Sequence, residues 1–143
     1  MLRQCVSVGS PTKGSGMVAV TGNLEVEDVR PFMPARDFER SAEFYSALGW
    51  SIVWTDNEGL ALMELGGCRL MLQDFYVRQW AENFVISVVV SDAAAWFERV
   101  ATAIEEGDYG DARVESPRSE SWGAIVTYAW DPSGVLLHFT QFT

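Results

Sequence analysis

The chain has 143 residues, of which 48% are hydrophobic, and this matches one domain with a packed core. Its 20 acidic and 10 basic residues give a net charge of −10, so it has no basic stripe for binding nucleic-acid phosphates or an anionic membrane. Such a charge is compatible with attracting cationic small molecules, although acidity also serves solubility. The sequence has no run of about 18 apolar residues, and we expect no membrane-spanning helix.

The first 23 residues are rich in Gly, Ser and Thr and have no sustained apolar segment, which makes them a poor signal peptide. We therefore expect residues 1–23 to be a disordered extension, with an ordered strand from Met17 to Thr21 as the alternative. Met17 could be the native start. Cys5 and Cys68 are too few for a disulfide framework, so we expect free thiols, a reducing compartment and a cytoplasmic protein.

Residues 24–76 predict a first module with one helix and four strands. An apolar extended run at Val29–Met33 precedes Asp37, which can cap a helix that stops at Gly49. The apolar stripe of this helix consists of Phe38, Ala42, Tyr45 and Leu48. Three strand-like runs follow, at Ser51–Thr55, Leu60–Leu65 and Cys68–Phe75.

Residues 77–83 would be a linker, and residues 84–143 repeat the same order of elements. Phe84–Val90 is an apolar extended run, and Asp92 can cap a helix that ends at Gly107. Its stripe consists of Trp96, Phe97, Val100 and Ile104. The strand-like runs that follow are Ala112–Glu115, Ala124–Trp130 and Val135–Phe142. The turn Asp131-Pro132-Ser133-Gly134 between the last two has type I residues.

This order predicts an α+β fold of two β-α-β-β-β modules, whose curved mixed sheets surround a crevice within one compact domain. One helix covers only one face of a four-stranded sheet, so the other face must meet the sister module, a second subunit or a ligand. Trp122, Tyr128 and Trp130 share one face of their strand by parity. Since helices usually pack on branched aliphatic side chains, we assign this aromatic face to the crevice.

Several motifs resemble the vicinal oxygen chelate superfamily, which includes glyoxalase I, extradiol dioxygenases and bleomycin resistance proteins. They are Pro34-Ala35-Arg36-Asp37, Glu43-Phe44-Tyr45, Leu48-Gly49-Trp50, Trp122-Gly123, Asp131-Pro132-Ser133-Gly134 and His138-Phe139. The likeness spans about residues 29–142 and is strongest to the bleomycin resistance branch. It implies a homodimer that holds a cationic, aromatic-tailed glycopeptide antibiotic in crevices between subunits, without chemistry on it. The long N-terminal extension and the short linker depart from that branch.

The metalloenzymes of this superfamily bind a divalent ion with His, Glu or Gln at four positions. The resemblance places Arg30, Ile86 and His138 at three of these positions, and the fourth falls near Leu72 or Gln73. At most two of the four could coordinate, whereas a divalent site needs three or more ligands. An adjacent arginine would also repel the ion. We therefore expect no bound metal and no cofactor.

The candidate ligand-binding residues are aromatic or charged side chains of the predicted strands and linker: Arg30, Phe32, Trp54, Glu64, Phe75, Trp80, Phe84, Trp122, Tyr128 and His138. Aromatic walls suit flat or cationic ligands, and they equally suit a dimer interface. Arg30 could instead pair with a nearby carboxylate, Glu64 could be solvated, and His138 could be a half-buried neutral residue. Trp50 and Trp96 are expected in the core.

The sequence thus predicts a metal-free, bleomycin-resistance-like binding protein that sequesters a cationic or aromatic small molecule in an acidic, aromatic-lined crevice, as a homodimer. Two enzymatic alternatives remain, and we regard an enzyme as the less favoured class. One is a glyoxalase- or dioxygenase-like metal-dependent lyase. The other is a metal-free isomerase with His138 as its base. The sequence has no Ser-His-Asp set, phosphate loop or Cys-His pair that would assign a catalytic residue.

Overall fold

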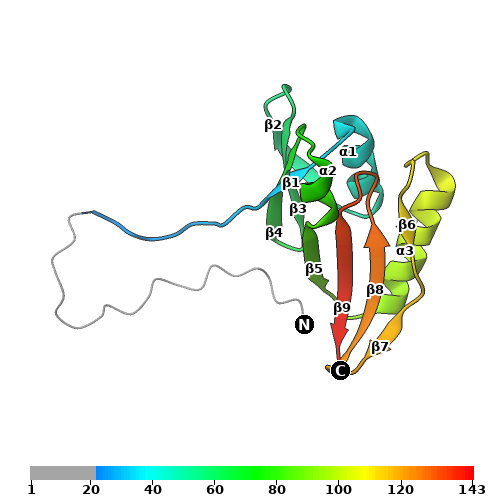
Figure 1. The fold of residues 1–143 in the computed structure, drawn as a ribbon. Coiled ribbons are helices and arrows are strands. Elements are labelled where there is room, and N and C mark those ends of the chain that lie inside the picture. Colours follow the sequence, from blue (N-terminus) through cyan, green and yellow to red (C-terminus); the bar gives the residue numbers. More distant parts are fainter. Residues whose placement is uncertain (1–21) are drawn as a thin grey trace, which may run out of the picture.

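The computed structural model describes residues 22–143, which form two mixed β-sheets, each with a helix against one face (Figure 1). This is the α+β architecture of two mixed sheets predicted from the sequence. Three expectations from the sequence concern residues outside the described part of the chain: the strand at Met17–Thr21, Cys5 and most of the extension. Cys68 is disulfide-bonded, so the free thiol expected there is wrong. Within residues 22–143, no helix is long and apolar enough to cross a membrane.

The first sheet is built from four strands and carries one helix. Its elements are β1 (Phe32–Pro34), α1 (Phe38–Ala47), β2 (Ser51–Thr55), β3 (Leu60–Leu65) and β4 (Cys68–Gln73). The strands lie in the order β1-β4-β3-β2, with β1 parallel to β4 and the other pairs antiparallel. Gly66 and Gly67, with φ of 59° and 81°, make the tight turn between β3 and β4, because glycine adopts positive φ without steric cost.

The second sheet repeats this order with one additional strand. Its elements are β5 (Val85–Val89), α3 (Ala93–Glu106), β6 (Arg113–Val114), β7 (Arg118–Glu120), β8 (Ala124–Trp130) and β9 (Leu136–Phe142). The order is β5-β9-β8-β6, with β5 parallel to β9, and β7 also pairs with β8. As predicted, Asp131 and Gly134 close a tight turn between β8 and β9, in which the Gly134 amide donates to the Asp131 carbonyl oxygen at 3.1 Å.

Both helices begin at the predicted aspartates. Asp37 Oδ1 accepts from the Arg40 amide at 3.1 Å, and Asp92 Oδ1 accepts from the Ala95 amide at 3.0 Å. These bonds satisfy amide groups that the first helical turn leaves without a partner. The N-terminal ends of α1 and α3 therefore follow from local capping chemistry.

The hydrophobic core lies where the helices meet the inner faces of the sheets. Phe44 and Tyr45 of α1, Val100 of α3 and Phe139 of β9 are fully or almost fully buried in it. Trp50 is buried, as predicted. Trp96 is only partly buried, yet its ring stacks on the Phe139 ring with centroids 4.7 Å apart. The two modules therefore share one core.

A polar junction also joins the modules. The Tyr45 hydroxyl of α1 donates to Asp131 Oδ2 at 2.6 Å, and Asp131 Oδ1 accepts from the Ser133 and Val135 amides. Ser41 Oγ lies 3.2 Å from Ser133 Oγ. Burial raises the pKa of Asp131 to about 6, and its hydrogen bonds only partly oppose that rise. The β8–β9 turn is thus fixed to the first helix.

Three segments differ from the prediction. The linker region contains a short helix, α2 (Arg78–Glu82). The first strand was expected at Val29–Met33 and forms at Phe32–Pro34, so residues 22–31 run as an extended arm away from the sheets (Figure 1). Strand β7 was not predicted.

Candidate ligand-binding faces

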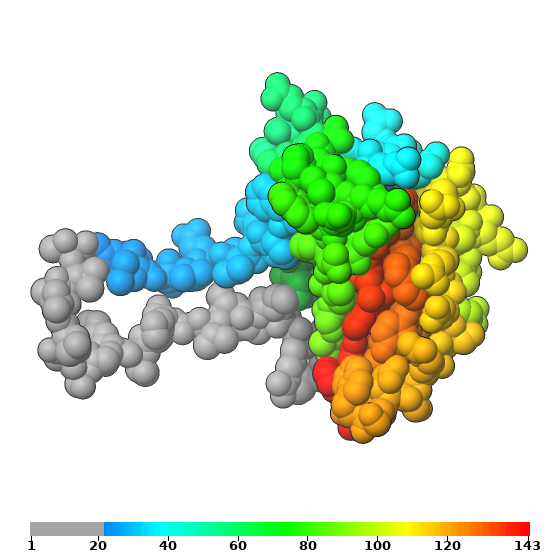
Figure 2. Space-filling model, in the orientation of Figure 1, coloured from blue at the N-terminus to red at the C-terminus, as the bar shows by residue number. Residues whose placement is uncertain are grey.

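The second sheet has an inner face against α3 and an outer face without a helix. The Thr127 hydroxyl donates to the Ala93 carbonyl oxygen of α3 at 2.7 Å, so Tyr128, its neighbour in the strand, points to the outer face. We name this outer surface the second open face; it carries Val85, Ser87, Val89, Arg113, Arg118, Glu120, Tyr128, Trp130, Leu136 and His138. The predicted position of the aromatic face, away from the helix, is confirmed. Figure 2 shows β8 and β9 as a broad surface bordered by β5 and the β6–β7 segment.

Tyr128 is at the centre of a polar cluster on the second open face. Its hydroxyl donates to Glu120 Oε1 at 2.8 Å, and the Arg118 guanidinium lies 4.6 Å from its ring centroid. Arg118 and Glu120 form an ion pair at 3.6 Å. The His138 ring packs edge-to-face against Tyr128, with centroids 4.8 Å apart. Two strands, β7 and β9, therefore hold the phenol from both sides.

Burial raises the pKa of Tyr128, and the hydrogen bond to Glu120 raises it further. Burial lowers the pKa of His138, while the Glu120 carboxylate raises it. Because the net shift is downward from an ordinary value near 6.5, His138 is neutral at pH 7. This is the half-buried, neutral histidine that the sequence offered as one alternative.

The charges on the second open face are balanced, so the expected acidic character is not found there. Arg113 lies 3.5 Å from the Trp130 ring centroid and 3.3 Å from Glu115, and Arg118 faces Glu120. Each carboxylate is matched because β6 and β7 place an arginine two residues before a glutamate. These arginines also cover the aromatic rings that a flat ligand would contact.

The outer surface of the first sheet carries a second group of predicted site residues, which we name the first open face. Cross-strand pairing aligns Phe32, Met71, Leu62 and Trp54 in one row. Phe32 and Trp54, at the two edges, are 50% and 49% exposed. Glu64 lies on the same face, paired with Arg69 at 2.8 Å.

Arg30 precedes this sheet and pairs with Asp28 at 2.8 Å, which is the carboxylate alternative raised from the sequence. Phe75 and Trp80 form an exposed pair beside α2, with ring centroids 6.1 Å apart. Trp122 packs edge-on against Phe142 at the far end of β8. These residues do not lie in one cluster.

The predicted placement of Phe84 and Ile86 on the site side of their strand is wrong. Both pack against the core, because the residues of β5 on the outer face are Val85, Ser87 and Val89. Phe84 is therefore removed from the candidate site. The β5 residue beside His138 is Ser87, not Ile86. Among residues 22–143, no three His, Cys, Asp or Glu side chains come together as metal ligands.

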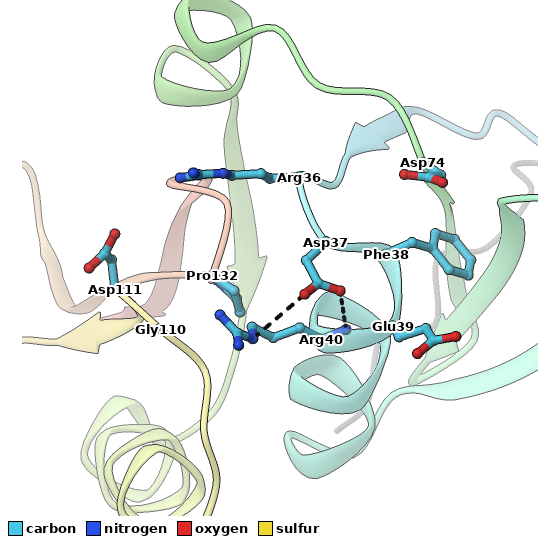
Figure 3. Close-up of a pocket in the computed structure, with 9 residues that line it drawn as sticks. All are labelled: Arg36, Asp37, Phe38, Glu39, Arg40, Asp74, Gly110, Asp111 and Pro132. Carbon is cyan, nitrogen blue, oxygen red and sulfur yellow. Dashed lines mark hydrogen bonds and ion pairs between the residues drawn. The ribbon is translucent and has the colours of Figure 1, made fainter.

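Two hollows of about 680 Å³ each lie near the β8–β9 turn, the first at the start of α1 and the second at the end of the second open face, where Arg113 and Trp130 line it. They share Arg36, Asp111 and Pro132. Figure 3 shows Arg36 extending over Pro132 toward the side where Asp111 lies, while Arg40 turns back to the Asp37 cap. Arg113, Arg118 and Glu120 were not among the predicted site residues, because only the folded sheet brings them beside Tyr128 and Trp130.

The edges of the two open faces stay exposed, since Phe32, Trp54, Val85 and Val89 are all about half exposed or more, whereas Leu62 and Met71 in the middle of the first face are buried. Exposed apolar surface of this extent on two sheets marks a binding surface.

Comparison with known proteins agrees with this geometry. Residues 29–139 match the model of the Glyoxalase/Bleomycin resistance protein/Dioxygenase superfamily. A bleomycin resistance protein of Klebsiella pneumoniae is 30% identical over 119 residues, covering 80% of this chain and 92% of that protein.

Two solved structures are similar. A bleomycin-binding protein complexed with bleomycin is 27% identical, with a TM-score of 0.68, over 82% of this chain and all of the other. A bleomycin resistance determinant encoded on the transposon Tn5 is 28% identical, with a TM-score of 0.68, over 82% of this chain and 98% of the other. The chain belongs to the glyoxalase/bleomycin resistance protein/dioxygenase superfamily.

Proposed function

We propose that this protein binds and sequesters a bleomycin-type small molecule, with flat aromatic and cationic parts, without metal and without chemistry. The observation that carries the proposal is the aromatic surface around Tyr128, Trp130 and His138 on a sheet face without a helix, in a chain whose relatives include bleomycin-binding proteins. The cytoplasmic location expected from the sequence is part of this proposal.

The proposed contacts follow from the residues on the second open face. A flat ring system would stack on Tyr128 and Trp130 once Arg118 and Arg113 move aside, replacing two cation–π contacts by ring–ring contacts. Glu120, freed from Arg118, would then face a cationic group of the ligand. Neutral His138 would accept or donate one hydrogen bond at the edge of the site.

The crevice itself would form between two protomers. The exposure of both open faces supports this, because a second copy could place its first open face, with Phe32 and Trp54, over the Tyr128 side. The arm formed by residues 22–31 also favours it: Leu24, Val26 and Val29 are all at least two-thirds exposed, and their burial needs a neighbouring chain. Aromatic side chains are enriched at such interfaces.

Titration of tryptophan fluorescence with metal-free bleomycin tests the proposal. We expect saturable quenching at micromolar concentrations, weakened at least about tenfold in Tyr128→Ala, since stacking and burial of one ring contribute more than 1.4 kcal/mol. Tyr128→Phe is the matched control, because it keeps the ring and loses only the hydroxyl. The absence of any signal at about 100 μM bleomycin would overturn the proposal.

A further inference from the structure

The second of the two hollows lies where the second open face meets α2. We name it the arginine pocket, after Arg36, Arg78 and Arg113, which line it together with Tyr76 and Trp130. Its volume of about 680 Å³ fits a drug-sized molecule. In Figure 2, α2 overhangs the surface of β8 and β9 at this place.

The pocket gathers three arginines in an acidic protein, beside the carboxyl groups of Glu82, Asp111 and Asp131. Residues 22–143 contain eight arginines and no lysine, and three of the eight line this one hollow. Arg78 is neutralised by Glu82 at 2.8 Å, and Arg113 pairs at 3.3 Å with Glu115, which does not line the pocket. Within the described part of the chain, Arg36 has no ion pair with any carboxylate.

Two of these guanidinium groups are positioned by aromatic rings. Arg36 lies 5.9 Å from the Tyr76 ring centroid, and Arg113 lies 3.5 Å from that of Trp130. A guanidinium that stacks on a ring keeps the N–H groups at its edge free, and these match the two oxygens of a carboxylate or phosphate. Aromatic support thus prepares both arginines to receive an anion.

The carboxyl groups of Asp131 and Asp111, which line the pocket, differ in their partners. Asp131 lies at its base, but both of its oxygens accept hydrogen bonds from Tyr45 and from its own turn. Asp111 is exposed on the wall and forms no ion pair among the described residues. Its removal would therefore make the pocket more attractive to an anion without freeing a paired arginine.

We propose that the arginine pocket binds an oxyanion, a carboxylate or a phosphate ester, carried by a small molecule whose flat ring packs beside Trp130. Arg36 and Arg113 hold the oxyanion, and Asp111 weakens its binding. The pocket shares Trp130 and Arg113 with the proposed stacking surface, whereas Arg36 lines the pocket and is not part of that surface.

Isothermal titration of the full chain with phenyl phosphate, benzoate and inorganic phosphate tests this assignment. We expect millimolar or tighter binding of phenyl phosphate or benzoate, with inorganic phosphate weaker because it has no ring. Arg36→Gln weakens binding at least fivefold, since a charge-assisted hydrogen bond is lost. Asp111→Asn strengthens binding about two- to fivefold, because a repulsive charge is removed.

Arg99→Gln is the matched control. Arg99 lies on α3 beside Trp96, also has no ion pair within residues 22–143, and is remote from the pocket lining. Equal weakening by Arg99→Gln, or no binding of any probe by the wild type at about 10 mM, overturns the proposal. Bleomycin titration of Arg36→Gln separates the two proposals, because we expect quenching there to equal that of the wild type whether or not the anion probes bind.

Discussion

Replacing Asp131 with Asn tests how the buried junction between the modules responds to pH. Asp131 Oδ1 accepts two backbone amides, and Oδ2 accepts the Tyr45 hydroxyl. An asparagine can keep the first two bonds through its oxygen and donate its amide to the Tyr45 oxygen. The Tyr45 hydroxyl proton can then turn to Met33 Sδ, which already lies 3.2 Å away. The substitution is therefore compatible with the fold.

The size of the pH effect on the free energy of unfolding follows from the raised pKa of Asp131. Burial shifts the pKa of Asp131 from 3.8 to about 6, so the folded state prefers the protonated acid. This preference stabilises the fold fully below about pH 4 and is lost as the pH rises through about 6. Integrated from pH 5 to pH 8, the free energy of unfolding should fall by about 1.4 kcal/mol in the wild type from this group alone.

Urea denaturation of the wild type and Asp131→Asn at pH 5, 6, 7 and 8 measures the effect. The difference between their free energies of unfolding cancels the contribution of the other carboxylates, which both proteins share. We expect the difference to change by about 1.4 kcal/mol between pH 5 and pH 8 in favour of Asp131→Asn. Tyr45→Phe should cost about 1–3 kcal/mol, because one carboxylate oxygen then lacks its donor. Parallel pH profiles for the wild type and Asp131→Asn would refute the reasoning.

Three further predictions concern the open faces and the first helix. In the free protein, Tyr128→Ala should lower the free energy of unfolding by well under the about 3–5 kcal/mol typical for truncating a buried aromatic residue, because its ring lines an open face. Chemical denaturation measures this change, and a loss of the full core amount would place the ring in the core. Sedimentation equilibrium at micromolar concentration should give about twice the 15.9 kDa of one chain, and a monomer mass would contradict the shared crevice. Asp37→Ala should lower the free energy of unfolding by about 1 kcal/mol through loss of the cap, while Asp56→Ala, in an exposed turn with its own local hydrogen bonds, serves as a comparison for a non-helical position.

Much of the fold could be predicted because local signals agreed with one another. β2, β3 and β8 begin and end where the runs Ser51–Thr55, Leu60–Leu65 and Ala124–Trp130 were expected. Each is an apolar run bounded by turn residues. The first strand shows the limit of such patterns: Val29 is apolar, but only Phe32–Pro34 pair with β4, and pairing depends on a strand some 40 residues away.

The site was less predictable because it depends on contacts between strands. Arg118-Ser119-Glu120 has no apolar alternation, and it becomes β7 only by pairing with the exposed edge of β8. That pairing places Arg118 on Tyr128 and removes the expected acidic character of the face. The alternation of side chains along β8 predicted which side of the strand is aromatic, because this alternation does not depend on a partner strand. It could not predict the arginines that cover the aromatic rings, because these come from neighbouring strands.

The junction at Asp131 bears on how the chain can fold at all. The Tyr45 hydroxyl and Ser41 Oγ meet partners that are 86 and 92 residues later in the sequence, in the turn between β8 and β9. During synthesis, α1 would be complete long before its buried polar groups had anything to bind. The two modules should therefore mature together in one late, cooperative step, and a cut within α2 should release two unfolded halves rather than two stable modules.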